Sequence, residues 1–228
     1  MTRPRRIIQE LTWAQLEAVH NLFRKEELRD AMYHVSSWLI LHFWTDDYEK
    51  SNALGVLLLT WNNSFYRFGN LDFDLIQEAL KKHKDQIDDL RERDIQTCLG
   101  KEKEKIGCLY KDLMQALRSK KKNSSAGTFA VSPVSAGKAL HLLCPKFFPL
   151  WDNKIANAYS CKWTSSERSF ESYWRFMIIS KAQVEQLNSS GSEPPDLRDI
   201  PTLKLIDEYN YMCFTKEKCG SLKNDAKT

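Results

Sequence analysis

The sequence predicts an all-α protein of about nine or ten helices, and three observations support this fold class. Glycine and proline are scarce, at 8 and 7 residues in a chain of 228, which favours helices joined by short connections over many strands. Apolar residues recur at helical spacing in almost every segment. No segment shows the strong alternation of a half-buried strand, and no internal repeat is visible. We expect one all-helical domain over residues 1–220, with a polar tail over 221–228. An arrangement in two lobes around a groove is compatible with this pattern.

The first third of the chain contains the clearest helical patterns. Thr12 and Gln15 have the spacing of a capping box and predict a helix over residues 12–23. A second apolar period runs over residues 28–39. A third runs over residues 54–68 and is apolar nearly all round at its start, which predicts a central place in the core.

The middle of the chain predicts two further helices. Asp72 is a good helix cap, and Ile76 and Leu80 follow it on one face of a fourth helix. The continuation of this helix over residues 81–94 is mostly charged and is expected to be a solvated face. A fifth helix is predicted over residues 103–118.

The last third predicts the remaining helices. Residues 133–144 suit a short helix that stops before a proline, and Asp152 stands where the next helix begins. Thr164 and Glu167 form a second capping-box pattern, which predicts that a long helix opens there. Pro201 in a first helical turn introduces the last helix.

Positive charge is concentrated in residues 118–154. This segment contains seven Lys and Arg residues and a single acidic residue, Asp152, so its net charge is +6. The whole chain has a net charge of +4, so the remaining residues sum to −2. A basic surface around one carboxylate suits a protein that holds a phosphate backbone and carries out acid–base chemistry on it. A solvated basic loop followed by an ordinary helix cap is the alternative explanation.

The cysteines and the apolar runs limit the other possibilities. The six cysteines form no CxxC pair and have no His at metal-ligand spacing, so we expect no metal site and no cofactor. The start of the chain does not have the apolar run of an export signal, and the longest apolar run, residues 53–59, is too short to cross a bilayer. We therefore expect a cytoplasmic protein with reduced thiols and no membrane contact.

Two short motifs in the basic segment resemble those of a known family. The segment 133–135 (Pro-Val-Ser) precedes a helix with Lys138 in its first turn, and the segment 149–152 (Pro-Leu-Trp-Asp) stands at the start of the next helix. Over roughly residues 127–160 this arrangement resembles the helix-hairpin-helix DNA glycosylase superfamily, the endonuclease III-like base-excision enzymes. In that family a Gly-Val-Gly hairpin precedes a helix that often carries a catalytic Lys, and a catalytic Asp follows in a Pro-x-x-Val-Asp-type segment.

The chain departs from the family pattern in the hairpin. Pro133 and Ser135 replace the two glycines, and the iron–sulfur cysteine cluster of some members is absent. Gly137 stands where the family Lys would align, and Lys138 follows one position later. One residue turns a helical side chain by about 100°. The resemblance therefore implies a monofunctional N-glycosylase rather than a lyase.

The resemblance also implies residue roles and a partner. Asp152 would be the key carboxylate and Lys138 a second catalytic residue, acting on duplex DNA from which one base has been flipped into a pocket. The residues expected to hold the phosphate backbone are Lys120, Lys121, Lys122, Ser135 and Lys146, and those expected to line the base pocket are Trp61, Asn62, Tyr66 and Trp151.

Each of these residues also has an ordinary structural interpretation. Asp152 could be a simple helix cap and Trp61 core packing. Asn62 could mark a helix kink or belong to a satisfied buried polar pair with Asn63, and the lysine run could belong to a solvated loop. His141 is expected to be structural. Two alternatives to the glycosylase hypothesis therefore stay open: a non-catalytic nucleic-acid-binding helical module and a helical protein-interaction domain. The sequence specifies neither the oligomeric state nor the base removed.

Overall fold

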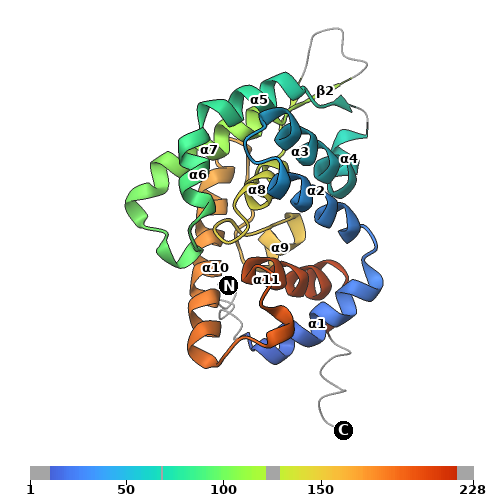
Figure 1. Cartoon of the computed structure of the whole chain (residues 1–228), viewed down its shortest axis with the longest axis vertical. Coiled ribbons are helices and arrows are strands. Elements are labelled where there is room, and N and C mark those ends of the chain that lie inside the picture. Colours follow the sequence, from blue (N-terminus) through green and yellow to red (C-terminus); the bar gives the residue numbers. More distant parts are fainter. Residues whose placement is uncertain (1–10, 68, 122–128, 220–228) are drawn as a thin grey trace.

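The computed structural model describes residues 11–67, 69–121 and 129–219. This part of the chain contains eleven α-helices and one small three-stranded antiparallel sheet, so the predicted all-α class is confirmed (Figure 1). The helices are α1 (Trp13–Glu26), α2 (Asp30–His42), α3 (Asp47–Trp61), α4 (Asn63–Tyr66), α5 (Phe73–Lys82), α6 (Lys84–Arg91), α7 (Lys103–Ala116), α8 (Pro133–Leu143), α9 (Asn153–Ala158), α10 (Ser169–Ser190) and α11 (Thr202–Asn210). The strands are β1 (Gly69–Asn70), β2 (Ser119–Lys121) and β3 (Phe129–Ala130), and four short turns are η1 (Ile95–Thr97), η2 (Gly100–Glu102), η3 (Pro195–Leu197) and η4 (Tyr211–Thr215), the last with π-helical bonding.

Helix α8 lies at the centre of the molecule. Ten of its eleven residues are buried, because α2, α3, α7 and α10 all pack against it (Figure 1). Gly137 also allows a close contact with the segment before α9, since a Cβ atom there would lie 2.7 Å from the indole ring of Trp151. The remaining residue of the helix, Lys138, is only partly buried. Lys138 is thus the one residue of this central helix whose side chain extends out of the core.

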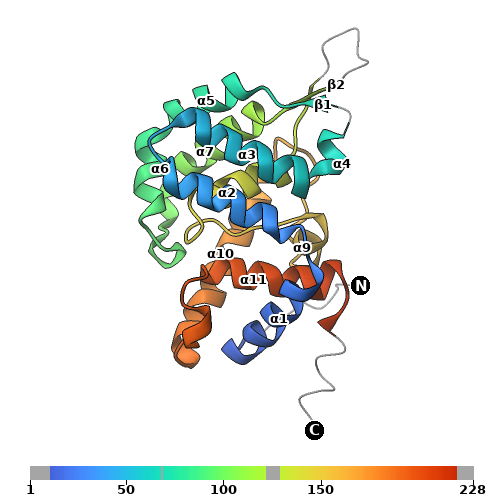
Figure 2. The ribbon, with the colours of Figure 1, turned by 45° about the vertical axis from the view of Figure 1, so that its right-hand side comes forward.

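The first and last described helices lie side by side. Helix α1 packs along α11, below the layer formed by α2, α3 and α5 to α8 (Figure 2). A bond of 2.6 Å between His20 Nδ1 and Glu208 Oε2 joins the two helices. This pairing brings the loop after α1 next to the end of α11 and to η4.

Three of the predicted helix starts are confirmed. Thr12 and Gln15 form the complete capping box of α1. The side chain of Asp72 accepts a hydrogen bond from the amide of Leu75 at the start of α5. Asp152 caps α9 in the same way. These signals depend only on nearby residues, which is why the sequence identifies them.

Three other helix boundaries differ from the prediction. The capping-box pattern at Thr164 does not open α10, which begins at Ser169. A separate turn precedes the helix, because the amide and the hydroxyl of Ser169 both donate to the carbonyl of Ser166. The helix predicted over 54–68 ends at Trp61, and α4 follows; Phe68 lies outside the described residues. The charged segment after α5 was expected to be a solvated continuation of that helix. It is instead a separate amphipathic helix, α6, with two buried side chains.

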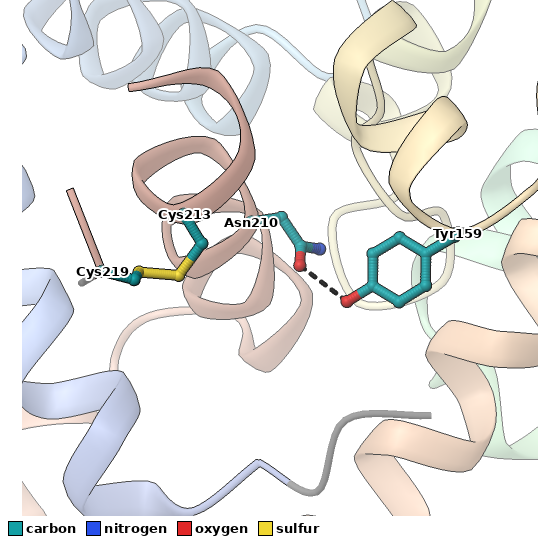
Figure 3. Close-up of a disulfide and its surroundings, with 4 residues drawn as sticks. All are labelled: Tyr159, Asn210, Cys213 and Cys219. Carbon is teal, nitrogen blue, oxygen red and sulfur yellow. Dashed lines mark hydrogen bonds between the residues drawn. A yellow bond between two sulfur atoms is a disulfide. The ribbon is translucent and has the colours of Figure 1, made fainter. Parts of the chain in front are cut away.

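Cys213 and Cys219 form a disulfide, which corrects the expectation that all thiols are reduced (Figure 3). The bond lies beside η4, close to Asn210, whose side-chain oxygen accepts a 2.7 Å hydrogen bond from the hydroxyl of Tyr159. The other four cysteines are free. Within the described residues, no helix is both long enough and apolar enough to cross a membrane.

Candidate functional site

A pocket of about 320 Å³ opens where the ends of α1, α3, α8 and α11 meet the start of α9. Its walls include Lys138, Asp152 and Trp61, three residues that the sequence predicted as site residues. Lys138 and Asp152 come from consecutive helices, whereas Trp61 comes from a segment far earlier in the chain. The fold therefore places the predicted carboxylate, the predicted amine and an aromatic ring around one cavity.

Lys138 reaches the pocket from the first turns of α8. Its Nζ atom donates a 2.6 Å hydrogen bond to the main-chain carbonyl oxygen of Trp61. Burial lowers the pKa of Lys138 to about 8, although the negative charges of Asp207 and Asp152 oppose this change. Near neutral pH a measurable fraction of this amine is therefore uncharged.

Asp152 is both a helix cap and a pocket carboxylate. Its Oδ1 atom accepts a 2.7 Å hydrogen bond from the amide of Ile155, and its Oδ2 atom accepts a 3.1 Å bond from the hydroxyl of Thr215. The two bonds fix the orientation of the carboxylate. The carboxylate remains partly exposed to the pocket, so the capping role and a catalytic role are compatible.

Asp207 is a second pocket carboxyl that the sequence analysis did not identify. It lies on α11 and is 9% exposed. Burial raises the pKa of Asp207 to about 7, in opposition to the nearby positive charge of Lys204. An acidic residue inside the apolar pattern of the last helix was the available signal, because Leu203 and Ile206 flank this position on the helix.

A buried ammonium group lies beneath the aromatic wall of the pocket. Lys204 Nζ is 2.7 Å from Glu208 Oε1 and 3.0 Å from Asp30 Oδ1, so its charge is paired. The same atom lies 4.4 Å from the ring centre of Phe23 and 5.5 Å from that of Trp61. These contacts stabilise the cation and position both rings at the pocket.

Trp61 is part of this wall rather than of the deep core. Its ring is stacked on that of Tyr33 at 5.5 Å and 18°, and its Nε1 atom donates to the carbonyl of Arg29 at 2.9 Å. Asn62 follows it and also lines the pocket. The side chain of Asn62 donates to the hydroxyls of Ser132 and Ser135, which fits its interpretation as a helix break.

Three other predicted residues are held inside the fold. Ser135 is fully buried, and its hydroxyl accepts hydrogen bonds from Asn62 and Tyr66. Tyr66 is 3% exposed, donates to the carbonyl of Leu117 and does not line the pocket. Trp151 does line the pocket but is 1% exposed. This burial differs from the predicted phosphate contact of Ser135 and base contact of Tyr66, because the two hydroxyls bond each other and other groups inside the fold.

Of the predicted lysines, Lys146 does not line the pocket. Lys120 and Lys121 lie on β2, and Lys122 lies outside the described residues. Lys146 is exposed just beyond the other end of α8, where its carbonyl accepts from the amide of Ile95. Strand β2 nevertheless stands on the same side of the molecule as α9 (Figure 2).

Other cations lie nearer the pocket, and the sequence analysis missed them. Exposed Arg29 and Lys154 are both in its wall. The guanidinium of Arg29 bonds Glu27 at 2.7 Å and the hydroxyl of Tyr211 at 2.8 Å. Arg29 in turn lowers the pKa of Glu27 to about 2. Glu27 and Arg29 lie in the loop after α1, Lys154 lies on α9 and Tyr211 lies in η4, and these segments meet only in the folded chain.

His141 has the structural role that the sequence predicted. Its Nδ1 atom is 2.8 Å from the carbonyl of Phe148, and its Nε2 atom is 2.9 Å from the hydroxyl of Tyr33. Complete burial lowers the pKa of His141 to about 3, so the ring is neutral at physiological pH.

The pocket residues provide groups for acid–base and binding chemistry. Across the described ranges, no group of three or more His, Cys, Asp or Glu side chains could hold a metal ion. Comparison with known proteins adds no further assignment: no family model, no curated protein and no solved structure matches this chain significantly.

Proposed function

We propose that this protein is a DNA N-glycosylase of the base-excision type, with Asp152 as its key carboxylate. One observation carries the proposal: Asp152, Lys138 and Trp61 border the same pocket. Pockets for small molecules range from about 300 to 1,000 Å³. At about 320 Å³, this pocket suits a single heterocyclic base rather than a longer stretch of nucleic acid.

The reaction breaks the bond between C1′ of the sugar and the base nitrogen, and the bonding electrons leave with the base. Positive charge develops on the sugar, and the carboxylate of Asp152 stabilises it. A water molecule then adds to C1′ and gives its proton to Asp152, and this proton passes on to the nitrogen of the departed base, which restores the carboxylate. Because two hydrogen bonds hold Asp152 in one orientation, little reorganisation is needed during the reaction.

The rim of the pocket supports contact with a phosphate backbone. Arg29 and Lys154 are exposed there. Such cations bind phosphates without reading the sequence. The base itself enters the pocket only after it has left the stack.

Release of bases from a panel of duplex oligonucleotides, each with one damaged base, tests the proposal. Asp152→Asn is expected to abolish release and to leave duplex binding nearly unchanged, because Asn is as good a helix cap as Asp. Asp72→Asn is the matched control, since Asp72 also caps its helix through the third amide. Equal loss in both variants, or unchanged release by Asp152→Asn, would contradict the assignment.

A non-catalytic nucleic-acid-binding module is the second candidate. The observation that favours it is that both oxygens of Asp152 already accept hydrogen bonds within the protein. Duplex binding that weakens with salt, together with no base release, would support this candidate. Lys121→Ala combined with Lys122→Ala should then weaken binding without sequence preference. A log–log salt slope near zero would exclude both candidates and favour a protein-interaction domain.

A further inference from the structure

Asp207 is a buried carboxyl group without a hydrogen-bond partner among the described residues. It is 9% exposed and lines the same pocket as Lys138 and Asp152. Its oxygen atoms are not among the fully enclosed side-chain atoms that lack a partner, so they are open to the pocket, and a polar ligand there can bond them. Asp152, by contrast, is already bonded at both oxygens.

The surroundings of Asp207 determine its protonation. Burial raises its pKa to about 7, and this effect outweighs the attraction of Lys204, whose charge is shared with Asp30 and Glu208. A neutral carboxyl group therefore coexists with a carboxylate near neutral pH. The charged or titratable groups close by or on elements packed against α11 are Lys138 of α8, Asp152 before α9, Lys204 and Glu208 of α11, Asp30 of α2, His20 of α1 and Tyr211 of η4.

A neutral carboxyl group offers one donor and one acceptor side by side. The lactam edge of a nucleobase, with an N–H next to a carbonyl, complements this pair, and so does an amidine edge. A base with a methyl group on that ring nitrogen cannot form both bonds. The aromatic wall and the size of the pocket suit the same class of ligand.

We propose that Asp207 binds the polar edge of a nucleobase in this pocket and selects bases that place an N–H or ring nitrogen beside an exocyclic oxygen or amino group. This inference rests on the proposed function for the class of ligand and extends it to specificity. The two carboxyl groups then have separate tasks. Asp152 faces the sugar, and Asp207 holds the base.

The test uses hypoxanthine and 1-methylhypoxanthine as probes, with binding followed by NMR titration of the full chain at pH 6 and pH 8.5. At pH 6 the wild-type protein should bind hypoxanthine about tenfold more tightly than its methylated analogue, the value expected from one or two hydrogen bonds. Binding of hypoxanthine should weaken about tenfold at pH 8.5, because ionised Asp207 has no proton to donate.

Two variants separate the role of Asp207 from that of its neighbours. Asp207→Asn keeps a donor and an acceptor, so it should bind hypoxanthine within about threefold of the wild type at pH 6 and lose most of the pH dependence. Lys138 also titrates in this pH range. The pH dependence of binding that remains in Asp207→Asn therefore measures the contribution of Lys138 to hypoxanthine binding. Asp207→Leu should weaken binding about tenfold. If Asp207→Leu does not fold, the loss of pH dependence in Asp207→Asn and the weaker binding of 1-methylhypoxanthine to the wild type still test the inference.

Equal binding of the two probes, or binding that is unaffected in Asp207→Leu, would overturn the inference. So would the absence of hypoxanthine binding to the wild type at both pH values. The proposed function fails separately, if no oligonucleotide releases a base although hypoxanthine binding depends on Asp207. Base release that depends on Asp152 but is unaltered by Asp207→Leu would overturn the inference alone.

Discussion

Lys138 donates a 2.6 Å hydrogen bond to the main-chain carbonyl oxygen of Trp61, a residue 77 positions earlier in the chain. Trp61 is the last residue of α3, and the carbonyl groups at a helix end have no partner within their helix. An ammonium group at this end also interacts favourably with the helix dipole. The bond thus positions the amine of α8 at the pocket while burial makes its charge less stable.

The first prediction concerns the titration of Lys138. Because burial lowers the pKa of Lys138 to about 8, reductive methylation with ¹³C-formaldehyde should give one lysine resonance that titrates near pH 8. Lys138→Met should lack this resonance, while exposed lysines such as Lys82, whose pKa Asp112 raises, serve as internal controls. A spectrum in which every lysine titrates near pH 10 or above would contradict the prediction.

The second prediction concerns stability and Asp207. The pKa of this carboxyl is about 7 in the folded protein and 3.8 in the reference state, so between these values the folded state holds the extra proton. Its contribution to the free energy of unfolding is therefore present below about pH 4 and is lost as the pH rises to 7. Asp207→Asn should raise stability at pH 8 by about 2 kcal/mol or more.

Denaturant unfolding at pH 4 and pH 8 measures this effect. Asp207→Asn should match the wild type at pH 4, where both side chains are neutral, and exceed it only at pH 8. Asp196→Asn is a suitable control, since Asp196 is exposed. A gain of the same size at both pH values would show that the substitution acts through packing and not through ionisation.

The third prediction concerns the close packing of α8. Gly137→Ala places a methyl group 2.7 Å from two atoms of the Trp151 ring, so it should destabilise the protein by about 1–3 kcal/mol. Gly100→Ala is the matched control, because no atom lies within 4 Å of its added Cβ. Thermal or denaturant unfolding compares the two variants. Equal stability would mean that Trp151 moves away at little cost.

The fourth prediction concerns the disulfide beside η4 (Figure 3). Thiol titration of the denatured, unreduced protein should detect four free cysteines, namely Cys98, Cys108, Cys144 and Cys161. Replacing Cys213 and Cys219 together with serine should lower the free energy of unfolding by about 2 kcal/mol, the value expected for a short loop. Six titratable thiols in the wild type would contradict the bond.

The sequence predicted those features that depend on neighbouring residues. The caps at Thr12, Asp72 and Asp152 each involve an amide two or three positions away, and each is present. The association of Asp152 with Lys138 was also predicted, because a short connection joins their helices. They line a common pocket with Trp61, and their functional roles stay a proposal.

The other features of the pocket depend on contacts between residues that are far apart in the chain. Tyr211 donates to Glu27 across 184 residues, and Thr215 donates to Asp152 across 63. No local pattern indicates such pairs. The sequence also could not show that the hydroxyls of Ser135 and Tyr66 bond each other, because this bond forms only once α4 has packed against α8.

The pairing of α1 with α11 has a consequence for biosynthesis. One part of the pocket wall comes from the loop after α1 and an adjoining part from residues after 202, so the cavity is complete only when both segments have been synthesised and have met. A nascent polypeptide halted before residue 202 would carry Lys138 and Asp152 without Asp207 and without the hydroxyl of Thr215. A nascent chain still bound to the ribosome would thus lack the complete pocket, so ligand binding at this pocket requires that translation has passed the last helix.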